Sequence, residues 1–426
     1  MKTRNADHGS TLAIVKSWLP ILAGIFVLIT ITCLAKANAD APPDVFAPAL
    51  RNEAGFYSLL PDEDIECFAE LGDVLYAGGK NGLFVLNRDT FAPMSHIDSS
   101  GKLSFVRSIQ ADQDGTLWIG SIHGVLQYNP ASGSETWWST RNGLPDNRVN
   151  VLYTDNSGRL WVGTWGGAAW YDAAGWHVWR KADGLASDMV NVICEDGLGG
   201  MWFGAYNVPD GVLSILSDFN RFTGEKASGG ILPEKHKKRA AATDSYLSPA
   251  SAKSLQWTYL SVEDGIPHSS VTSLIQESPG IMWVGAGFLE SGGACQVDFF
   301  KDDWRVIGVY HKGTGEEQTS RKQAATRMDG FTTPVYEGLV GEKVRSLFLD
   351  SHHRLWLGSE YDGCSILYPA EEPGAPFPND TPLKWLTTDN GLCDAEIKRV
   401  HEDRNGTFWL ATRSGITVIP GDGIVP

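Results

Sequence analysis

Basic, amide and aromatic residues recur at positions where a repeated chain pattern would bring loops together. A guanidinium or ammonium group donates charge-assisted hydrogen bonds, and an indole or phenol ring offers a flat apolar face. Such groups on one rim suit a polar ligand with stackable faces, such as a sugar. A solvated rim with Arg–Asp pairs between neighbouring repeats is the alternative interpretation. The predicted ligand-binding residues are Arg107, Arg148, Asn150, Trp165, Tyr206, Arg345, Tyr361, Lys398 and Arg413.

Catalytic motifs give no positive support for an enzyme. No Gly-x-Ser-x-Gly elbow, P-loop, HExxH motif or dinucleotide fingerprint occurs in a suitable strand–helix context. A lyase or hydrolase on the same rim would need a histidine or carboxylate pair facing it. His123 with Glu66 or Glu396 is the combination that the sequence offers. We therefore predict no catalytic residue and no cofactor.

Five aspartates at regular intervals resemble metal ligands at first sight. Each is followed six residues later by tryptophan, usually with an intervening glycine, so a tight turn capped by the acid is the better explanation. We predict no metal site. The five acids are Asp112, Asp155, Asp196, Asp350 and Asp403.

Composition narrows the class of protein. The 426 residues include 47 Gly and 16 Trp, and this combination favours many tight turns between short aromatic strands. The formal net charge of −16 repels phosphate backbones, so we expect no nucleic-acid partner.

An internal repeat organises most of the chain. Its aromatic residue falls at positions 76, 118, 161, 202, 283, 356 and 409, and a glycine follows two residues later in every copy except the last, which has Ala411. The first three spacings match a propeller blade of about 40–45 residues with four strands. Longer spacings imply insertions at about 222–252 and 312–330. The pattern predicts an all-β, seven-bladed propeller over residues 56–426.

The two ends of the repeat region predict how the ring closes. The last copy ends at its third strand, near 416–419, and lacks an outer strand. A strand at 56–60, just before the first repeat, could supply it. We expect the N-terminal strand to complete the C-terminal blade and remove the open edge.

The N-terminus carries an uncharged stretch of 19 residues, 17–35, preceded by Lys2, Arg4 and Lys16. This pattern places residues 1–41 as a short cytoplasmic tip plus a signal peptide or membrane anchor, with 42–55 as a linker. Either fate would export the remainder, so we expect a periplasmic protein that is released or anchored in the inner membrane.

The stretch from Asn142 to Val149, followed by DNSGRLWVGTWGGAAWYD, resembles the two-component regulator propeller repeat. Related stretches begin at Asp183, Asp264 and Asp389, so the resemblance covers about residues 56–420. It implies an extracytoplasmic, non-catalytic ligand-sensing propeller, with an oligosaccharide or other small polar ligand at the channel mouth. Because the chain has no kinase region, signalling would need a membrane histidine kinase or another protein partner. A lyase or hydrolase, or a protein–protein scaffold, remains the alternative.

Overall fold

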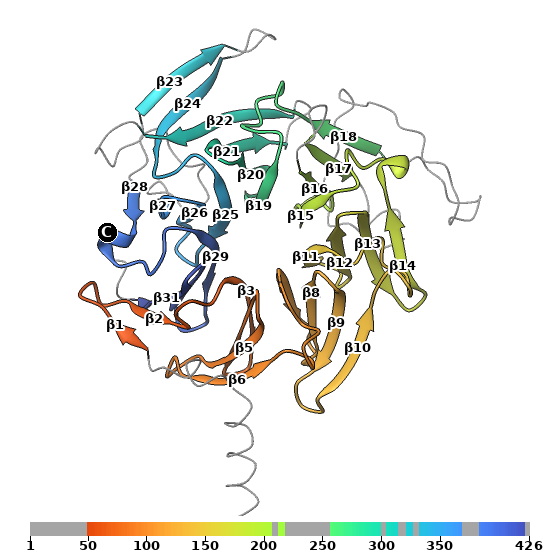
Figure 1. Cartoon of the computed structure of the whole chain (residues 1–426). Helices are drawn as coiled ribbons and strands as arrows, with labels where there is room; N and C mark the ends of the chain where they lie inside the picture. The colour runs from red at the N-terminus through yellow and green to blue at the C-terminus, as the bar shows by residue number, and fades with distance from the viewer. Residues whose placement is uncertain are drawn as a thin grey trace, which may run out of the picture.

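A computed structural model describes residues 49–206, 212–217, 256–299, 304–313, 321–326, 332–368 and 383–421. Within these residues the chain forms seven β-sheets that surround a central axis (Figure 1). Each sheet begins with the strand nearest the axis and proceeds outward through antiparallel neighbours, except for one parallel pair in blade 5. The predicted all-β, seven-bladed propeller is therefore confirmed.

The first three blades are regular four-stranded meanders. Blade 1 contains β3 (Ile65–Leu71), β4 (Val74–Gly79), β5 (Gly82–Asn87) and β6 (Pro93–Ile97). Blade 2 contains β7 (Ser108–Ala111), β8 (Leu117–Ser121), β9 (Gly124–Asn129) and β10 (Ser134–Trp138). Blade 3 contains β11 (Val149–Thr154), β12 (Leu160–Thr164), β13 (Gly167–Asp172) and β14 (Gly175–Trp179).

Blades 4 and 6 keep the same order, with the strand-to-strand connections lengthened. Blade 4 contains β15 (Val190–Glu195), β16 (Met201–Ala205), β17 (Leu213–Ser217) and β18 (Gln256–Leu260). Blade 6 contains β25 (Val344–Leu349), β26 (Leu355–Ser359), β27 (Cys364–Leu367) and β28 (Leu383–Leu386). The predicted insertion at 222–252 lies outside the described residues.

Blade 5 is enlarged to six strands. It contains β19 (Val271–Ser278), β20 (Ile281–Phe288), β21 (Ser291–Asp298), β22 (Arg305–Lys312), β23 (Arg321–Thr326) and β24 (Thr332–Leu339). β24 pairs in parallel with β22, and β23 pairs with the outer edge of β24 (Figure 1). β23 falls inside the predicted insertion at 312–330, so this segment extends the sheet outward.

Blade 7 joins the two ends of the chain. It contains β29 (Ile397–Glu402), β30 (Phe408–Thr412), β31 (Gly415–Ile419), β2 (Tyr57–Leu59) and β1 (Leu50–Arg51). β2 pairs antiparallel with β31, with Tyr57 opposite Val418 and Leu59 opposite Ile416. The predicted closure by the N-terminal strand is confirmed. β1, in the segment predicted as a linker, adds a fifth strand to the blade.

The repeated acid and tryptophan form one structural unit in each turn between the first and second strands. In blade 3, Asp155 Oδ1 accepts the backbone N–H groups of Ser157 at 3.0 Å and Arg159 at 2.9 Å. Asp155 Oδ2 accepts the indole N–H of Trp161 at 2.8 Å. The aspartate thus caps the turn and fixes the buried ring at the blade interface, which accounts for the repeat without a metal. The same acid–indole bond occurs at Trp118, Trp202, Trp283, Trp356 and Trp409.

The Gly-Leu or Gly-Ile pair between consecutive blades also has a packing role. Gly184 adopts φ +118°, a region that favours glycine, and a Cβ there would lie 2.1 Å from Trp257 Nε1. Leu185 beside it is buried. The pair therefore closes the loop against the outer strand of the next blade. Short 3₁₀ helices occur in two of these loops, at Lys181–Asp183 and Thr388–Asn390.

Nowhere in the described part of the chain is there a helix long and apolar enough to cross a bilayer. The apolar segment 17–35 lies outside the described residues.

Candidate functional site

The inner strands and the residues just before them deliver at least one side chain per blade to the channel. A buried aliphatic residue lies at the start of each inner strand, or two residues before it in blade 2, and the next residue lines a cavity of about 350 Å³ on the axis. In six blades the register of the first two strands shifts at this point, as in a β-bulge, and the extra residue leaves the ladder. We call these residues the channel ring: Glu66, Arg107, Asn150, Asn191, Thr272, Arg345 and Lys398.

The neutral half of the channel ring ties each blade to the next. Asn150 Nδ2 donates to the Val190 carbonyl at 2.9 Å, and Asn191 Nδ2 donates to the Val271 carbonyl at 2.8 Å. Thr272 Oγ1 donates to the carbonyl of Val344. These three side chains hold the inner strands at a fixed spacing around the channel.

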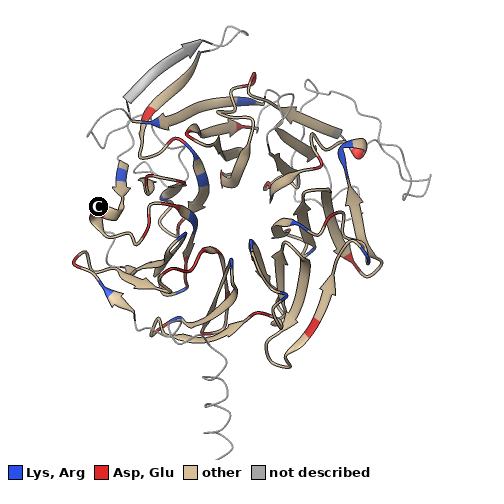
Figure 2. Ribbon diagram, viewed as in Figure 1, with Lys and Arg blue, Asp and Glu red and all other residues tan. Residues whose placement is uncertain are grey.

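The charged half of the channel ring is an ion-pair network. Glu66 accepts from Arg345 Nη2 at 3.2 Å and from Lys398 Nζ at 2.8 Å. Arg345 Nη1 also donates to Glu396 Oε1 at 2.5 Å, and Lys398 pairs with Asp64. Figure 2 shows basic positions along β25 and β29 beside the central opening.

Two carboxyls of this network have pKa values shifted in opposite directions. Burial alone would raise the pKa of Glu66, but Arg345 and Lys398 together hold it below its usual value. Burial raises the pKa of Glu396, and the two cations only partly oppose this. Glu66 is therefore the fixed negative charge of the cavity wall.

Six of the nine predicted ligand-binding residues line the cavity. They are Arg107, Asn150, Trp165, Tyr206, Arg345 and Lys398. Three of them meet directly, because Asn150 Oδ1 accepts from Arg107 Nη1 at 2.8 Å and from Trp165 Nε1 at 3.0 Å. The structure thus brings these six together at one end of the channel.

The other three predicted residues do not line this cavity. Arg148 lies over the Trp165 ring at 4.3 Å from its centroid and pairs with Asp146 at 3.0 Å, so it braces the rim. Tyr361 lines a neighbouring hollow beside Glu360, to which its hydroxyl donates at 2.9 Å. Arg413 is exposed in the turn between β30 and β31 and lines neither space.

Aromatic and aliphatic side chains surround the channel mouth on the same face. Exposed large apolar residues occur on the loops that connect second to third strands and on those that connect one blade to the next. Phe288 meets Tyr206 edge to face at 5.8 Å between ring centroids. This face therefore combines charge at its centre with stackable surfaces at its margin. The exposed residues on these loops are Phe105, Trp165, Val262, Phe288, Leu289 and Tyr361.

The acid–base pair considered for catalysis is not assembled. His123 Nε2 lies 3.3 Å from Ser104 Oγ and does not line the cavity, whereas Glu66 does. Both Glu66 and Glu396 already bind Arg345. The described residues therefore do not place His123 beside either carboxylate.

Besides Lys343, Arg399 is a basic cavity residue that is not among the nine predicted ones. It directly follows Lys398 of the channel ring, and its side chain is exposed to the channel. The sequence did indicate that this part of the last repeat differs from the others, because the last repeat alone has Ala411 where the others have glycine. Ala411 is the residue opposite Arg399 in the sheet.

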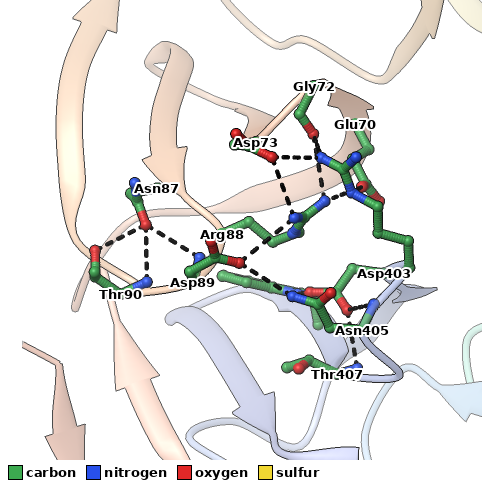
Figure 3. A network of polar contacts seen from close by, with 12 residues as sticks. Glu70, Gly72, Asp73, Asn87, Arg88, Asp89, Thr90, Asp403, Asn405 and Thr407 are labelled. Atoms are coloured by element: carbon green, nitrogen blue, oxygen red, sulfur yellow. Dashed lines mark hydrogen bonds and ion pairs between the residues drawn. The ribbon is translucent and has the colours of Figure 1, made fainter.

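A second polar cluster lies away from the channel, at the seam between blades 7 and 1 (Figure 3). Arg88 pairs with Glu70 at 2.5 Å, and Arg404 pairs with the same Glu70 at 3.1 Å. Asn405 Nδ2 donates to Asp89 at 3.0 Å. These bonds connect turns of the first and last blades, so the cluster belongs to ring closure and not to the candidate site.

Acidification is expected to destabilise this seam. Burial lowers the pKa of His401, while Glu70, at 3.5 Å, Asp403 and Glu402 act in the opposite direction without cancelling it. In the unfolded chain the His401 imidazole takes up a proton near pH 6.5, whereas in the folded chain it does so only at lower pH. The free energy of unfolding therefore falls as the pH drops below about 6.5. Thermal unfolding followed from about pH 7.5 to about pH 5.5 should show a falling midpoint.

His401→Gln should flatten this pH dependence without removing all of it. His268, whose pKa is lowered by burial and by Lys343, titrates in the same direction. A His401→Gln slope as steep as that of the natural chain would contradict the assignment.

Comparison with known proteins supports the repeat assignment. Residues 100–123 and 143–166 match the model of the two component regulator propeller family. The resemblance seen in the sequence is thus confirmed for the second and third blades. The sequence has no match among the curated proteins.

Solved structures share the architecture at low sequence identity. PorZ of Porphyromonas gingivalis, a surface component of the type-IX secretion system, is 14% identical with a TM-score of 0.53, over 89% of this chain and 48% of that one. The extracellular domain of BT4673 from B. thetaiotaomicron is 16% identical with a TM-score of 0.44, over 89% and 51%. An inactive virginiamycin B lyase from Staphylococcus aureus is 11% identical with a TM-score of 0.51, over 87% and 97%.

The two matches with TM-scores above 0.5 support the fold alone. The chain spans about half the length of the first solved structures it matches.

Proposed function

We propose that this protein is a non-catalytic, extracytoplasmic propeller that binds a small polar ligand, such as a carbohydrate, at the channel mouth. The observation that carries the proposal is the cavity of about 350 Å³ on the axis, lined by six of the nine residues predicted from the sequence. Ligand pockets usually have volumes of about 300–1,000 Å³, so a cavity near the lower limit suits a small ligand. The charged groups can bind its polar substituents, and Trp165 and Tyr206 can cover its apolar faces.

A signalling role follows from the kind of repeat. The matched family is described as a two component regulator propeller, and this description supports a signalling role through a second protein. We propose that ligand binding is reported to a membrane histidine kinase or another protein partner. The segment 17–35 would place the propeller on the outer side of the membrane, either tethered or released.

A lyase or hydrolase acting on the same rim is the second candidate. The raised pKa of Glu396 beside the lowered pKa of Glu66 is the observation in its favour, since such pairs can divide acid and base roles. Glu396→Gln distinguishes the two functions. A sensor keeps ligand affinity within a few-fold and shows no turnover, whereas an enzyme loses turnover in this variant.

Trp165→Ala is expected to weaken ligand binding by about tenfold or more, because a rim tryptophan supplies a large stacking surface. A thermal-shift screen of glycans and small anions identifies a ligand, and calorimetric titration then compares the variants. Phe105→Ala is the matched control, since Phe105 is an exposed aromatic of the same face that does not line the cavity. Equal losses in both variants, or no loss in Trp165→Ala, would count against the proposed site.

A further inference from the structure

The inner strand of blade 7 departs from the pattern of the other six blades at its third position. In those blades this residue is small and faces the neighbouring inner strand, as when Ser346 Oγ donates to the Ile397 carbonyl at 3.2 Å. The opposite strand has glycine, and a Cβ at Gly358 would lie 2.3 Å from Ser346 Oγ. Blade 7 replaces both members of this pair. The six small residues are Cys67, Ser108, Val151, Val192, Ser273 and Ser346.

Blade 7 has Arg399 at this position, opposite Ala411. A long guanidinium side chain takes the place of a tucked small one, and the glycine space is filled by a methyl group. Arg399 lines the cavity, and its side chain is exposed to the channel. The departure from the repeat therefore places a cation where the packing of the blades needs none.

The other cations of the cavity are already bound. Arg345 and Lys398 share Glu66, and Lys343 pairs with Glu360. Arg107 donates to the neutral Asn150 side chain. Within the described part of the chain, the Arg399 side chain has neither a hydrogen bond nor an ion pair, although its backbone belongs to the β29–β30 ladder.

The cavity also has an excess of positive charge in an acidic protein. Its lining contains five cationic residues and one carboxylate, Glu66, while the chain as a whole carries a formal charge of −16. Asp64, Glu360 and Glu396 lie outside the lining and pair with three of these cations, so one positive charge remains unbalanced. Although the side chain is exposed to the channel, desolvation by the surrounding wall lowers the pKa of Arg399, with Cys67 and Glu66 opposing the effect and Arg345 adding to it. An anion beside the guanidinium would relieve this cost. The five cations are Arg107, Lys343, Arg345, Lys398 and Arg399.

We infer that the channel is a receptor for an oxyanion group, carboxylate or phosphate, and that Arg399 is the residue that binds it. This inference rests on the proposed function and specifies the ligand class of that site. A guanidinium offers paired donors that match the two oxygens of such a group. Arg107 lines the same cavity from blade 2 and can supply a second positive charge.

The test titrates the full chain with inorganic phosphate, glucuronate and glucose, followed by calorimetry and thermal shift. Phosphate against glucuronate separates a phosphate site from a carboxylate site, and glucose is the uncharged counterpart of glucuronate. We expect one or both anions to bind and glucose to bind at least about tenfold more weakly.

Arg399→Ser restores the residue that blades 2, 5 and 6 carry at this position, so the fold should tolerate it. We expect this variant to lose at least about tenfold in anion affinity, and Arg399→Lys to lose less. Arg413→Ser is the control, because Arg413 is an exposed arginine outside the cavity, and it should bind like the natural chain.

The outcomes separate this inference from the proposed function. If the natural chain binds neither anion, or Arg399→Ser binds them unchanged, the oxyanion inference is wrong. If a neutral glycan nevertheless binds and Trp165→Ala removes that binding, the proposed function stands although the oxyanion inference fails. Equal losses in Arg399→Ser and Arg413→Ser would show a general charge effect and would overturn the assignment to Arg399.

Discussion

Removal of residues 49–60 is expected to destabilise the propeller by about 5–8 kcal/mol, an amount comparable to the whole stability of many domains. The segment contributes Phe56, Leu59 and Leu60, each of which is at most 5% exposed. Burial of one such side chain is worth about 1.5–3 kcal/mol. Removal of the segment would also uncover the edge of β31 that now pairs with β2, and this free edge could pair with other molecules.

Urea unfolding, followed by tryptophan fluorescence, measures this effect. A chain that begins at Pro61 is compared with one that begins at Ala49, so the two differ only by the closing strands. A synthetic peptide of residues 49–60 should restore much of the lost stability if the strand acts by pairing with β31. Equal unfolding midpoints for the two chains would show that blade 7 closes the ring without β2.

The blades and their closure were predictable because the signals that define them are local. Asp155 and Trp161 lie six residues apart in one turn, and their bond is repeated in every other blade whose turn acid is followed by tryptophan. The missing outer strand of the last copy then left Tyr57–Leu59 as its natural partner. A sequence period fixes such features directly.

The cavity lining was only partly predictable, because it depends on pairing between strands. A β-bulge decides which residue of an inner strand leaves the ladder, and this shift is set by the register with the second strand. Thr272 lines the cavity for this reason, although the repeat alone does not distinguish it from its neighbours. The parallel pairing of β24 with β22 is likewise non-local and was not predicted.

Predictions on loops were the least accurate, because a loop can place a residue near the mouth without turning it inward. Arg413 and Tyr361 occupy loops equivalent to that of Trp165, yet only Trp165 lines the cavity. Its indole is fixed by the hydrogen bond to Asn150. That contact depends on the side chain of a neighbouring strand and has no counterpart in the repeat pattern.

Asp350→Ala is expected to cost about 3–5 kcal/mol of stability, the range found when one partner of a buried ion pair is removed. The Asp350 side chain is 0% exposed, and its Oδ2 accepts from Trp356 Nε1 at 2.9 Å and from Arg354 Nε at 2.6 Å. Alanine would take away the acceptor of a buried indole and the carboxylate partner of a guanidinium that is only 9% exposed. In the variant, the Trp356 indole N–H and the Arg354 guanidinium would remain buried without the carboxylate that now accepts their hydrogen bonds, and this burial destabilises the folded state.

Asp403→Ala provides the matched comparison. Asp403 caps the equivalent turn and accepts from Trp409 Nε1 at 3.0 Å, but the residue equivalent to Arg354 is Thr407, which carries no charge. Its loss should therefore cost less than that of Asp350, and the difference measures the buried ion pair. Replacing Arg354 by Leu in the Asp350→Ala chain should recover part of the difference, since the buried charge is then gone. If thermal and urea unfolding gave the same loss for both aspartates, the ion pair would contribute nothing beyond the cap and the indole bond.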